Sequence, residues 1–297
     1  MPELRRKPVV LIVRDGWGEN PHKEWDHANA IHLANTPVAN SLMAEYPNVL
    51  IHTSGEDVGL PDGVMGNSEV GHQNIGAGRI VDQEVMRITR SIREGEFFQN
   101  KVLLDAIAHV KASGGKLHLL GLMSDGRVHS DIQHAYAFVE LAKQNGLSKN
   151  QFVVQAITDG RDTSPSGGIE FVGQVQSKLD ECGIGVVGSV VGRFYAMDRD
   201  LRWERVEAAY NMLTKGTAKT ANSASEAIQN YYDNPTEPSR KGDEFVEPVS
   251  IVDAEGNLSL VKDGDAVVFL NYRGDRTREI TKAFVYDDEA WSNIDGG

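Results

Sequence analysis

Short runs of apolar residues alternate along the chain with longer stretches in which apolar positions recur every three or four residues. The short runs predict buried strands, and the longer period predicts helices that pack on a sheet. Strands are predicted at about 9–13, 49–53, 116–122, 151–157, 184–191 and 266–271. Helices are predicted at about 27–45, 99–113, 131–145, 168–181, 201–214 and 276–285. This alternation is typical of an α/β protein with a largely parallel sheet and helices on both faces.

The alternation is most regular between residues 99 and 215. It loosens from Gly216 to Asp265, where residues 233–243 predict a polar, proline-bearing loop. A chain of 297 residues is long enough for about two domains with full hydrophobic cores. With 40% hydrophobic and 25% charged residues, the composition is that of a folded globular protein and not of a disordered or fibrous one.

The net charge narrows the possible partners. At −13, the chain lacks the basic field that nonspecific binding to nucleic acid or to an anionic membrane needs. The apolar run Val9–Val13 is too short for a signal peptide or a membrane span, so we expect a cytoplasmic protein. Cys182 is the single cysteine, which excludes an internal disulfide and predicts a small core residue. Any anionic ligand must be held by a local cluster of cations.

Two residues in the N-terminal part could carry chemistry. Asp15 directly follows the first predicted strand, where α/β sheets bind ligands, and its carboxylate could hold a hard metal ion. The alternative is an Asx turn. Ser68 lies in a segment with four glycines between residues 66 and 78, at the predicted start of a helix, where free N–H groups would stabilise an attached phosphate. The alternative is that Ser68 only caps this helix.

Two further candidates follow later strands. His129 lies on the loop after the strand at 116–122 and could act as a general acid or donate to a phosphate; the alternative is a solvated histidine. Arg161 lies between Asp159 and Asp162 after the next strand, so a carboxylate there could act as a base toward a sugar-acid hydroxyl while the arginine holds a carboxylate. The alternative is an ion pair that caps the following helix.

Arginines recur at the ends of three predicted strands. They are Arg161, Arg193, Arg199, Arg273 and Arg276. Surface arginines often only increase solubility, but repeated placement at one edge of a sheet in an acidic protein favours an anion pocket. The ligand that this pattern implies is small and carries several negative charges, as a phosphorylated carboxylic acid does.

Together these segments resemble the cofactor-independent (2,3-bisphosphoglycerate-independent) phosphoglycerate mutases of the alkaline phosphatase superfamily. Residues 65–79, Met-Gly-Asn-Ser-Glu-Val-Gly-His-Gln-Asn-Ile-Gly-Ala-Gly-Arg, look like the nucleophile segment of that family. Further motifs follow in the family's order and approximate spacing at 124–130, 159–162, 192–200 and 271–279. The resemblance implies a glycolytic and gluconeogenic isomerase that interconverts 3-phosphoglycerate and 2-phosphoglycerate through a phosphoserine.

The resemblance also implies roles for single residues. Ser68 matches the serine that takes the phosphate, and Asp15 and Ser68 match ligands of two Mn²⁺ ions. Asp162 matches the base that handles the glycerate hydroxyls. The positions that match substrate-binding residues are His129, Arg161, Asp162, Arg193, Arg199, Arg273 and Arg276.

Members of this family have a discontinuous phosphatase domain around an inserted transferase domain. The resemblance therefore implies that residues 1–82 are the N-terminal piece of an incomplete, metal-binding phosphatase domain and that 83–297 form an α/β transferase domain. The rest of the phosphatase domain would supply further metal ligands, which fits the absence of histidine after His134, and a separate C-terminal chain could provide it. Without it, we expect the chain to associate or aggregate.

Two other functions remain open at this level. The chain could be a catalytically silent fragment that still binds phosphoglycerate, or it could be a related metal-dependent phosphatase or phosphopentomutase.

Overall fold

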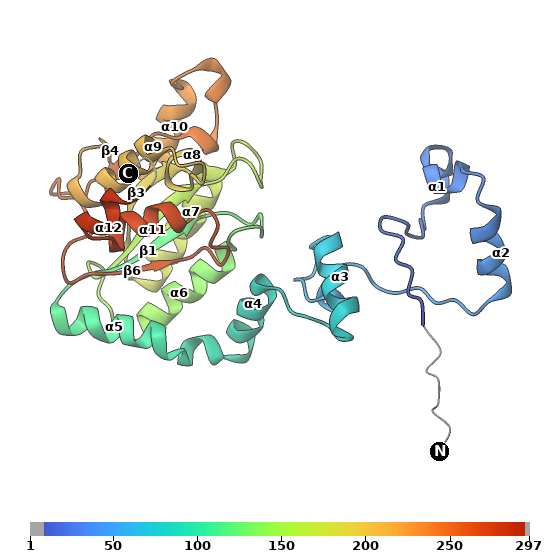
Figure 1. Ribbon diagram of the computed structural model, residues 1–297. Helices are drawn as coiled ribbons and strands as arrows, with labels where there is room; N and C mark the ends of the chain where they lie inside the picture. The colour runs from blue at the N-terminus through green and yellow to red at the C-terminus, as the bar shows by residue number, and fades with distance from the viewer. Residues whose placement is uncertain (1–8, 295–297) are drawn as a thin grey trace. The chain divides into compact units, whose positions relative to one another are not determined.

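The computed structural model describes residues 9–294, and the chain divides into two compact units, Met1–Gln83 (unit 1) and Glu84–Gly297 (unit 2). Unit 2 contains a six-stranded sheet with the order β4-β5-β3-β2-β1-β6 (Figure 1). The strands are β1 (Leu117–Leu122), β2 (Phe152–Thr158), β3 (Val186–Gly192), β4 (Lys219–Ala221), β5 (Val249–Ile251) and β6 (Ala266–Phe269). Neighbouring strands are parallel except β3 and β5, which are antiparallel.

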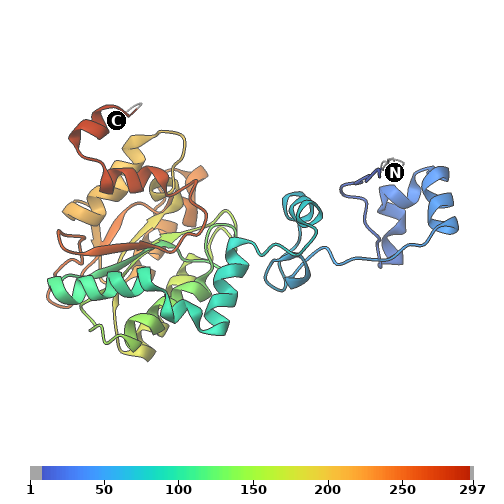
Figure 2. The ribbon, with the colours of Figure 1, turned by 60° about the horizontal axis from the view of Figure 1, so that its bottom comes forward.

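Helices cover both faces of this sheet (Figures 1 and 2). One face packs against α5 (Lys101–Ser113), α6 (Ile132–Gln144), α7 (Gly168–Cys182) and α10 (Ala224–Asp233). The other packs against α9 (Trp203–Lys215), α11 (Arg278–Val285) and α12 (Asp288–Ser292). The predicted α/β class, with a largely parallel sheet between two helical layers, is therefore confirmed.

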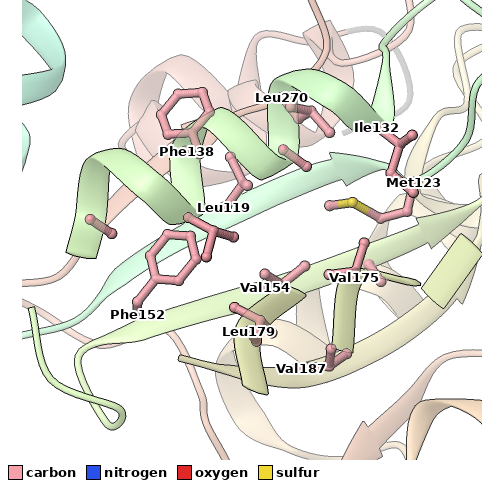
Figure 3. Packing of buried hydrophobic residues seen from close by; sticks show 14 of the residues in the cluster. Leu119, Met123, Ile132, Phe138, Phe152, Val154, Val175, Leu179, Val187 and Leu270 are labelled. Atoms are coloured by element: carbon pink, nitrogen blue, oxygen red, sulfur yellow. The ribbon is translucent and has the colours of Figure 1, made fainter. Parts of the chain in front are cut away.

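A hydrophobic core lies on each face of the sheet. Successive side chains of a strand point to opposite faces, so the apolar residues of each strand are divided between these two cores. In β1, Leu119 enters the first core, whereas Leu120 and Leu122 enter the second. Figure 3 shows Phe138 of α6 above the strands, with Leu119 of β1 and then Phe152 of β2 below it. All three side chains are buried. A strand that is buried on both faces needs a nearly continuous apolar sequence, which explains why β1, β2 and β3 were predictable. The edge strand β6 is only half-buried, but it has the same kind of apolar sequence.

The predicted elements of unit 2 begin and end within a few residues of the observed ones. Several elements were not predicted, most of them because they are too short to show a period. The helix Glu84–Glu94 and α10 are exceptions, since both carry a clear helical period of apolar positions that was not recognised. The elements that were not predicted are α4 (Glu84–Glu94), α8 (Arg193–Ala196), α10, α12, β4 and β5, and the 3-10 turns η3 (Glu96–Gln99), η4 (Pro238–Arg240) and η5 (Asp243–Phe245). Cys182 is buried at the end of α7, as predicted.

Unit 1 departs from the prediction. Its described elements are η1 (Lys23–Ala28), α1 (Ala30–Leu33), α2 (Pro37–Glu45), η2 (Glu56–Val58) and α3 (Ser68–Ala77). The predicted helix at 27–45 is divided into η1, α1 and α2, and α2 begins at Pro37, whose ring cannot continue a preceding helix.

The strands predicted at 9–13 and 49–53 are wrong for this structure. Both segments are extended but unpaired, and their apolar side chains face solvent, with Val9 95% and Ile12 78% exposed. A strand forms only where a neighbour pairs with its backbone N–H and C=O groups, and the described part of unit 1 offers none.

Candidate functional site

Four parallel strands of unit 2 end at the same edge of the sheet, and each is followed by a loop that carries candidate residues. The register places the ends of β1 and β2 side by side through Leu122 and Ile157, and those of β2 and β3 through Thr158 and Gly192. The loops after β1, β2, β3 and β6 thereby bring together His129, Arg161, Asp162, Arg193, Arg199, Arg273 and Arg276. We call this group the arginine cluster.

Arg193 is the most firmly held member of the cluster. It begins α8 directly after β3, its side chain is buried, and Nη1 donates to Asp159 Oδ1 at 2.7 Å and to Asp162 Oδ2 at 2.6 Å. Burial opposes the charge, but the hydrogen bonds and charges of the two carboxylates outweigh it and raise the pKa of Arg193. Arg193 is therefore a fixed, permanently charged group.

Asp159 organises the loop after β2. It is only 1% exposed and accepts hydrogen bonds from Ser124 Oγ at 2.6 Å, from the backbone N–H groups of Arg161 at 3.1 Å and Asp162 at 2.9 Å, and from Arg193. Burial works against ionisation, but these donors hold the pKa of the Asp159 carboxyl below its usual range. The carboxylate thus joins the ends of β1, β2 and β3.

His129 is buried, so the alternative of a solvated loop histidine is wrong. Its Nε2 lies 3.9 Å from Asp162 Oδ2, and its Nδ1 lies 3.8 Å from Asp275 Oδ1. Burial, and then the charge of Arg193, lower the pKa of His129 despite the two carboxylates. The imidazole is therefore mainly neutral at neutral pH and can donate one hydrogen bond and accept another.

Three arginines surround this buried centre with exposed side chains. Arg161 is 57%, Arg273 54% and Arg199 48% exposed. Arg161 Nη1 lies 3.5 Å from Glu244 Oε1. The residue at the N-cap position of α7 is Gly167, which has no side chain, so neither Arg161 nor Asp162 caps that helix. The alternative of a capping ion pair is therefore wrong.

Positive charge converges on Arg276. Its Nη1 donates to the Met197 carbonyl at 3.4 Å. Burial, and then the charges of Arg199, Arg193 and Arg161, lower the pKa of Arg276. An anion bound here would relieve this mutual repulsion.

The turn η5 supports the loops that carry the cluster. A Cβ added to Gly160 would lie 2.8 Å from the Glu244 nitrogen, and one added to Gly192 would lie 2.3 Å from the Glu244 carbonyl oxygen. Both loops therefore approach η5 so closely that only glycine fits. The side chain of Asp243 is buried, and it accepts from the Gly168 N–H at 2.7 Å and from the Tyr232 hydroxyl.

We expect Asp243→Asn to change how stability depends on pH. Burial raises the pKa of Asp243 to about 6 from its ordinary 3.8, so the folded protein binds the extra proton between these values. The stability that the folded protein gains from this extra proton is fully present below pH 3.8 and is lost as the pH rises through 6. An asparagine stays neutral, so from pH 4 to pH 7.5 the variant should gain about 2 to 3 kcal/mol in unfolding free energy relative to wild type. Urea titrations at both pH values measure this difference; parallel changes in the two proteins would contradict it.

Unit 1 contains a second, smaller group of candidates. Ser68 is the first residue of α3, and its Oγ donates to Asp15 Oδ2 at 2.5 Å and lies 3.3 Å from His72 Nδ1. The alternative that Ser68 caps the helix is wrong, because Asn67 accepts from the Val70 N–H at 3.1 Å. Asp15 lies in a turn, and its side chain accepts the hydrogen bond of the Ser68 hydroxyl.

The donors beside Ser68 fit part of a metal site. A carboxylate and a hydroxyl oxygen that already approach to 2.5 Å are the hard ligands that Mn²⁺ or Mg²⁺ prefers. Between residues 9 and 294, however, no three His, Cys, Asp or Glu side chains are grouped to hold a metal ion. The described residues therefore supply an incomplete ligand set.

Four residues that support the arginine cluster were not predicted: Ser124, Asp159, Asp275 and Glu244. For Asp159 a signal existed, since it is the first residue after β2, but it was considered only as a neighbour of Arg161. Glu244 lies in the irregular segment after α10, and no local pattern connects it with β2.

The fold and the cluster define a class: an α/β protein with a doubly wound sheet whose carboxyl edge carries a group of arginines. The profile described as "BPG-independent PGAM N-terminus (iPGM_N)" matches residues 88–295. The chain therefore belongs to the family of 2,3-bisphosphoglycerate-independent phosphoglycerate mutases.

Relatives agree with this assignment. The chain is 68% identical over its full length to the 2,3-bisphosphoglycerate-independent phosphoglycerate mutase of Rhodopirellula baltica, of which it covers 55%. It is 49% identical to that of Clostridioides difficile, covering 96% of this chain and 54% of the relative. A crystal structure of Leishmania mexicana phosphoglycerate mutase, determined at low cobalt concentration, matches with a TM-score of 0.70 and 34% identity over 93% of this chain and 50% of that one. The chain thus spans about half the length of its relatives.

Proposed function

We propose that the chain supplies the phosphoglycerate-binding domain and the phosphate-accepting serine of an enzyme that interconverts 3-phosphoglycerate and 2-phosphoglycerate. The observation that carries this proposal is the arginine cluster, in which five arginines from three loops surround a buried histidine and a carboxylate. A molecule with a phosphate and a carboxylate needs several cations at separate points, and guanidinium groups can bind each in two parallel hydrogen bonds. We propose that residues 83–297 are this transferase domain.

In unit 2, the proposed roles follow from how firmly each side chain is held. The exposed Arg161, Arg199 and Arg273 can close around the substrate, whereas the buried Arg193 supplies fixed charge. Asp162 is the candidate base, because its Oδ2 lies between Arg193 and His129. It would accept a proton from one glycerate hydroxyl and return it to the other, while the arginines retain the glycerate.

In unit 1, Ser68 is the proposed acceptor of the phosphate. Asp15 accepts the hydroxyl proton of Ser68 in a hydrogen bond, which orients Oγ. We propose that the complete site holds two Mn²⁺ ions and that Asp15 and Ser68 would contribute some of their ligands. When bound, such ions favour the serine alkoxide and stabilise charge on the transferring phosphoryl group.

We further propose that residues 1–82 form one piece of a phosphatase domain. The rest of that domain would come from the part of the relatives' sequence that this chain does not span. The exposed apolar segments 9–13 and 49–53 support this proposal, because their sequences favour strands that lack a partner. Within residues 9–294, no helix is both long and apolar enough to cross a membrane. A glycolytic role in the cytoplasm is part of the proposal.

Calorimetric titration of the chain with 3-phosphoglycerate tests the binding half of the proposal. We expect saturable binding that Arg199→Met weakens by about tenfold. Arg87→Met is the matched control, because Arg87 is an exposed arginine that pairs with Glu84 on α4. A chain that binds no phosphoglycerate, or that binds it equally well without Arg199, would contradict the proposal.

A second candidate is the silent fragment, which binds phosphoglycerate without converting it. The observation that favours it is that the described residues 9–294 supply only part of a metal ligand set, Asp15 and Ser68, whereas all five arginines of the cluster are present. A coupled assay with 3-phosphoglycerate and Mn²⁺ separates the two candidates, since only the enzyme gives turnover that Ser68→Ala removes. Turnover of a pentose phosphate in its place would favour the phosphopentomutase alternative.

A further inference from the structure

One carboxylate lies among the arginines where an anionic ligand would be expected. Asp275 lies between Arg273 and Arg276 on the loop after β6. Its Oδ2 accepts from Arg199 Nη1 at 2.9 Å, and its Oδ1 lies 3.3 Å from Arg273 Nε. Two of the three exposed arginines of the cluster are thus already paired with a carboxylate from the chain itself.

We propose that Asp275 is an internal counter-ion: its carboxylate holds Arg199 and Arg273, and an incoming anion displaces it from them. The proposal rests on the proposed function only in the identity of that anion. A substrate phosphate or carboxylate needs the same guanidinium donors, so Asp275 and the ligand compete for them.

The pairing is loose enough to be displaced. The side chain of Asp275 is 31% exposed, and both arginines are about half exposed, so solvent screens these ion pairs. This contrasts with Asp159, which is buried and fully hydrogen-bonded to Arg193 and its own loop. Asp159 therefore fixes its arginine, whereas Asp275 can release its partners.

The structure also provides a second partner for the displaced carboxylate. The atoms Asp275 Oδ1 and His129 Nδ1 are both buried. Apart from the ion pair of Oδ1 with Arg273, which is not a hydrogen bond, neither atom has a hydrogen-bond partner among the described residues. They lie 3.8 Å apart, so a movement of about 1 Å would form a hydrogen bond between them. An anion on the arginines would thereby transfer Asp275 to the histidine, and two unsatisfied groups would become paired.

Removing the charge of Asp275 should therefore strengthen anion binding. We expect Asp275→Asn to bind inorganic phosphate about tenfold more tightly than wild type in calorimetric titrations at low salt. The gain should shrink as salt is raised to 0.5 M, because exposed charges are screened. Asp275→Glu keeps the charge and should stay near wild type. Asp180→Asn, which removes the same charge from the exposed end of α7, should leave the affinity unchanged.

Each result has one meaning. Unchanged or weaker phosphate binding by a folded Asp275→Asn, with a wild-type melting temperature, would overturn the proposal and show that Asp275 only positions the arginines. Titration of wild type with 3-phosphoglycerate tests the proposed function separately. If the variant gains affinity for phosphate while neither protein binds 3-phosphoglycerate, the counter-ion proposal stands and the proposed substrate is wrong.

Discussion

Replacing Arg193 by methionine is expected to lower the unfolding free energy of unit 2 by about 3 to 5 kcal/mol, because it leaves a buried carboxylate without its cation. Arg193 donates to Asp159 at 2.7 Å and to Asp162 at 2.6 Å, and Asp159 is 1% exposed. Methionine fills much of the same volume but supplies no donor. Urea unfolding followed by far-ultraviolet circular dichroism at pH 7 measures the loss.

The pH dependence separates this charge effect from lost packing. The pKa of Asp159 is held below its ordinary value of 3.8 in the folded protein, so its contribution to stability is present above that pH and is lost as the pH falls through the lowered pKa. The difference in unfolding free energy between wild type and Arg193→Met should therefore be largest near neutral pH and should decrease at acidic pH. A difference that is constant with pH would indicate packing alone.

Arg161→Met is the matched control. Arg161 is 57% exposed and lies 3.5 Å from Glu244, so its removal should cost less than about 1 kcal/mol. Both variants should bind 3-phosphoglycerate more weakly, but only Arg193→Met should be destabilised. A loss below about 1 kcal/mol for Arg193→Met would show that the buried pair adds no net stability.

This contrast also shows how far sequence reasoning reaches. The strands β1, β2, β3 and β6 are short apolar runs, and parallel strands place the loops that follow them at one edge. The gathering of His129, Asp162 and Arg193 therefore follows from their position after strands. Which carboxylate pairs with which arginine depends on side-chain geometry and could not be predicted.

Two failures have a different cause. The segments 9–13 and 49–53 have the composition of buried strands, but a strand also needs a neighbouring chain segment to pair with. Asp243 and Glu244 were assigned only to an irregular segment, since η5 is defined by its contacts with Gly160 and Gly192 and not by a local pattern. Both failures concern pairings between segments far apart in the chain, which local periodicity does not record.

Ser68→Ala is expected to abolish phosphoryl transfer and leave phosphoglycerate binding intact. For this test, the chain is combined with Mn²⁺ and with a second chain. The second chain supplies the part of the relatives' sequence that this chain does not span. Loss of the nucleophile should then lower turnover of 3-phosphoglycerate by about 10⁴-fold or more. The substitution removes only the Ser68 hydroxyl and none of the guanidinium groups proposed to hold the anion, so calorimetric binding of 3-phosphoglycerate to the chain alone should not change.

The two units thus make separable contributions, and the pair of variants tests this. Arg193→Met should lose both binding and turnover, whereas Ser68→Ala should lose turnover alone. Ser41→Ala, an exposed serine on α2 in the same unit, should behave as wild type. Mass spectrometry of the assembled enzyme after brief exposure to substrate should place a phosphate on the peptide that contains Ser68. Turnover by Ser68→Ala, or a phosphate found on another residue, would contradict the proposal. Either result would mean that the Ser68 hydroxyl, which donates to Asp15, is not the phosphate acceptor.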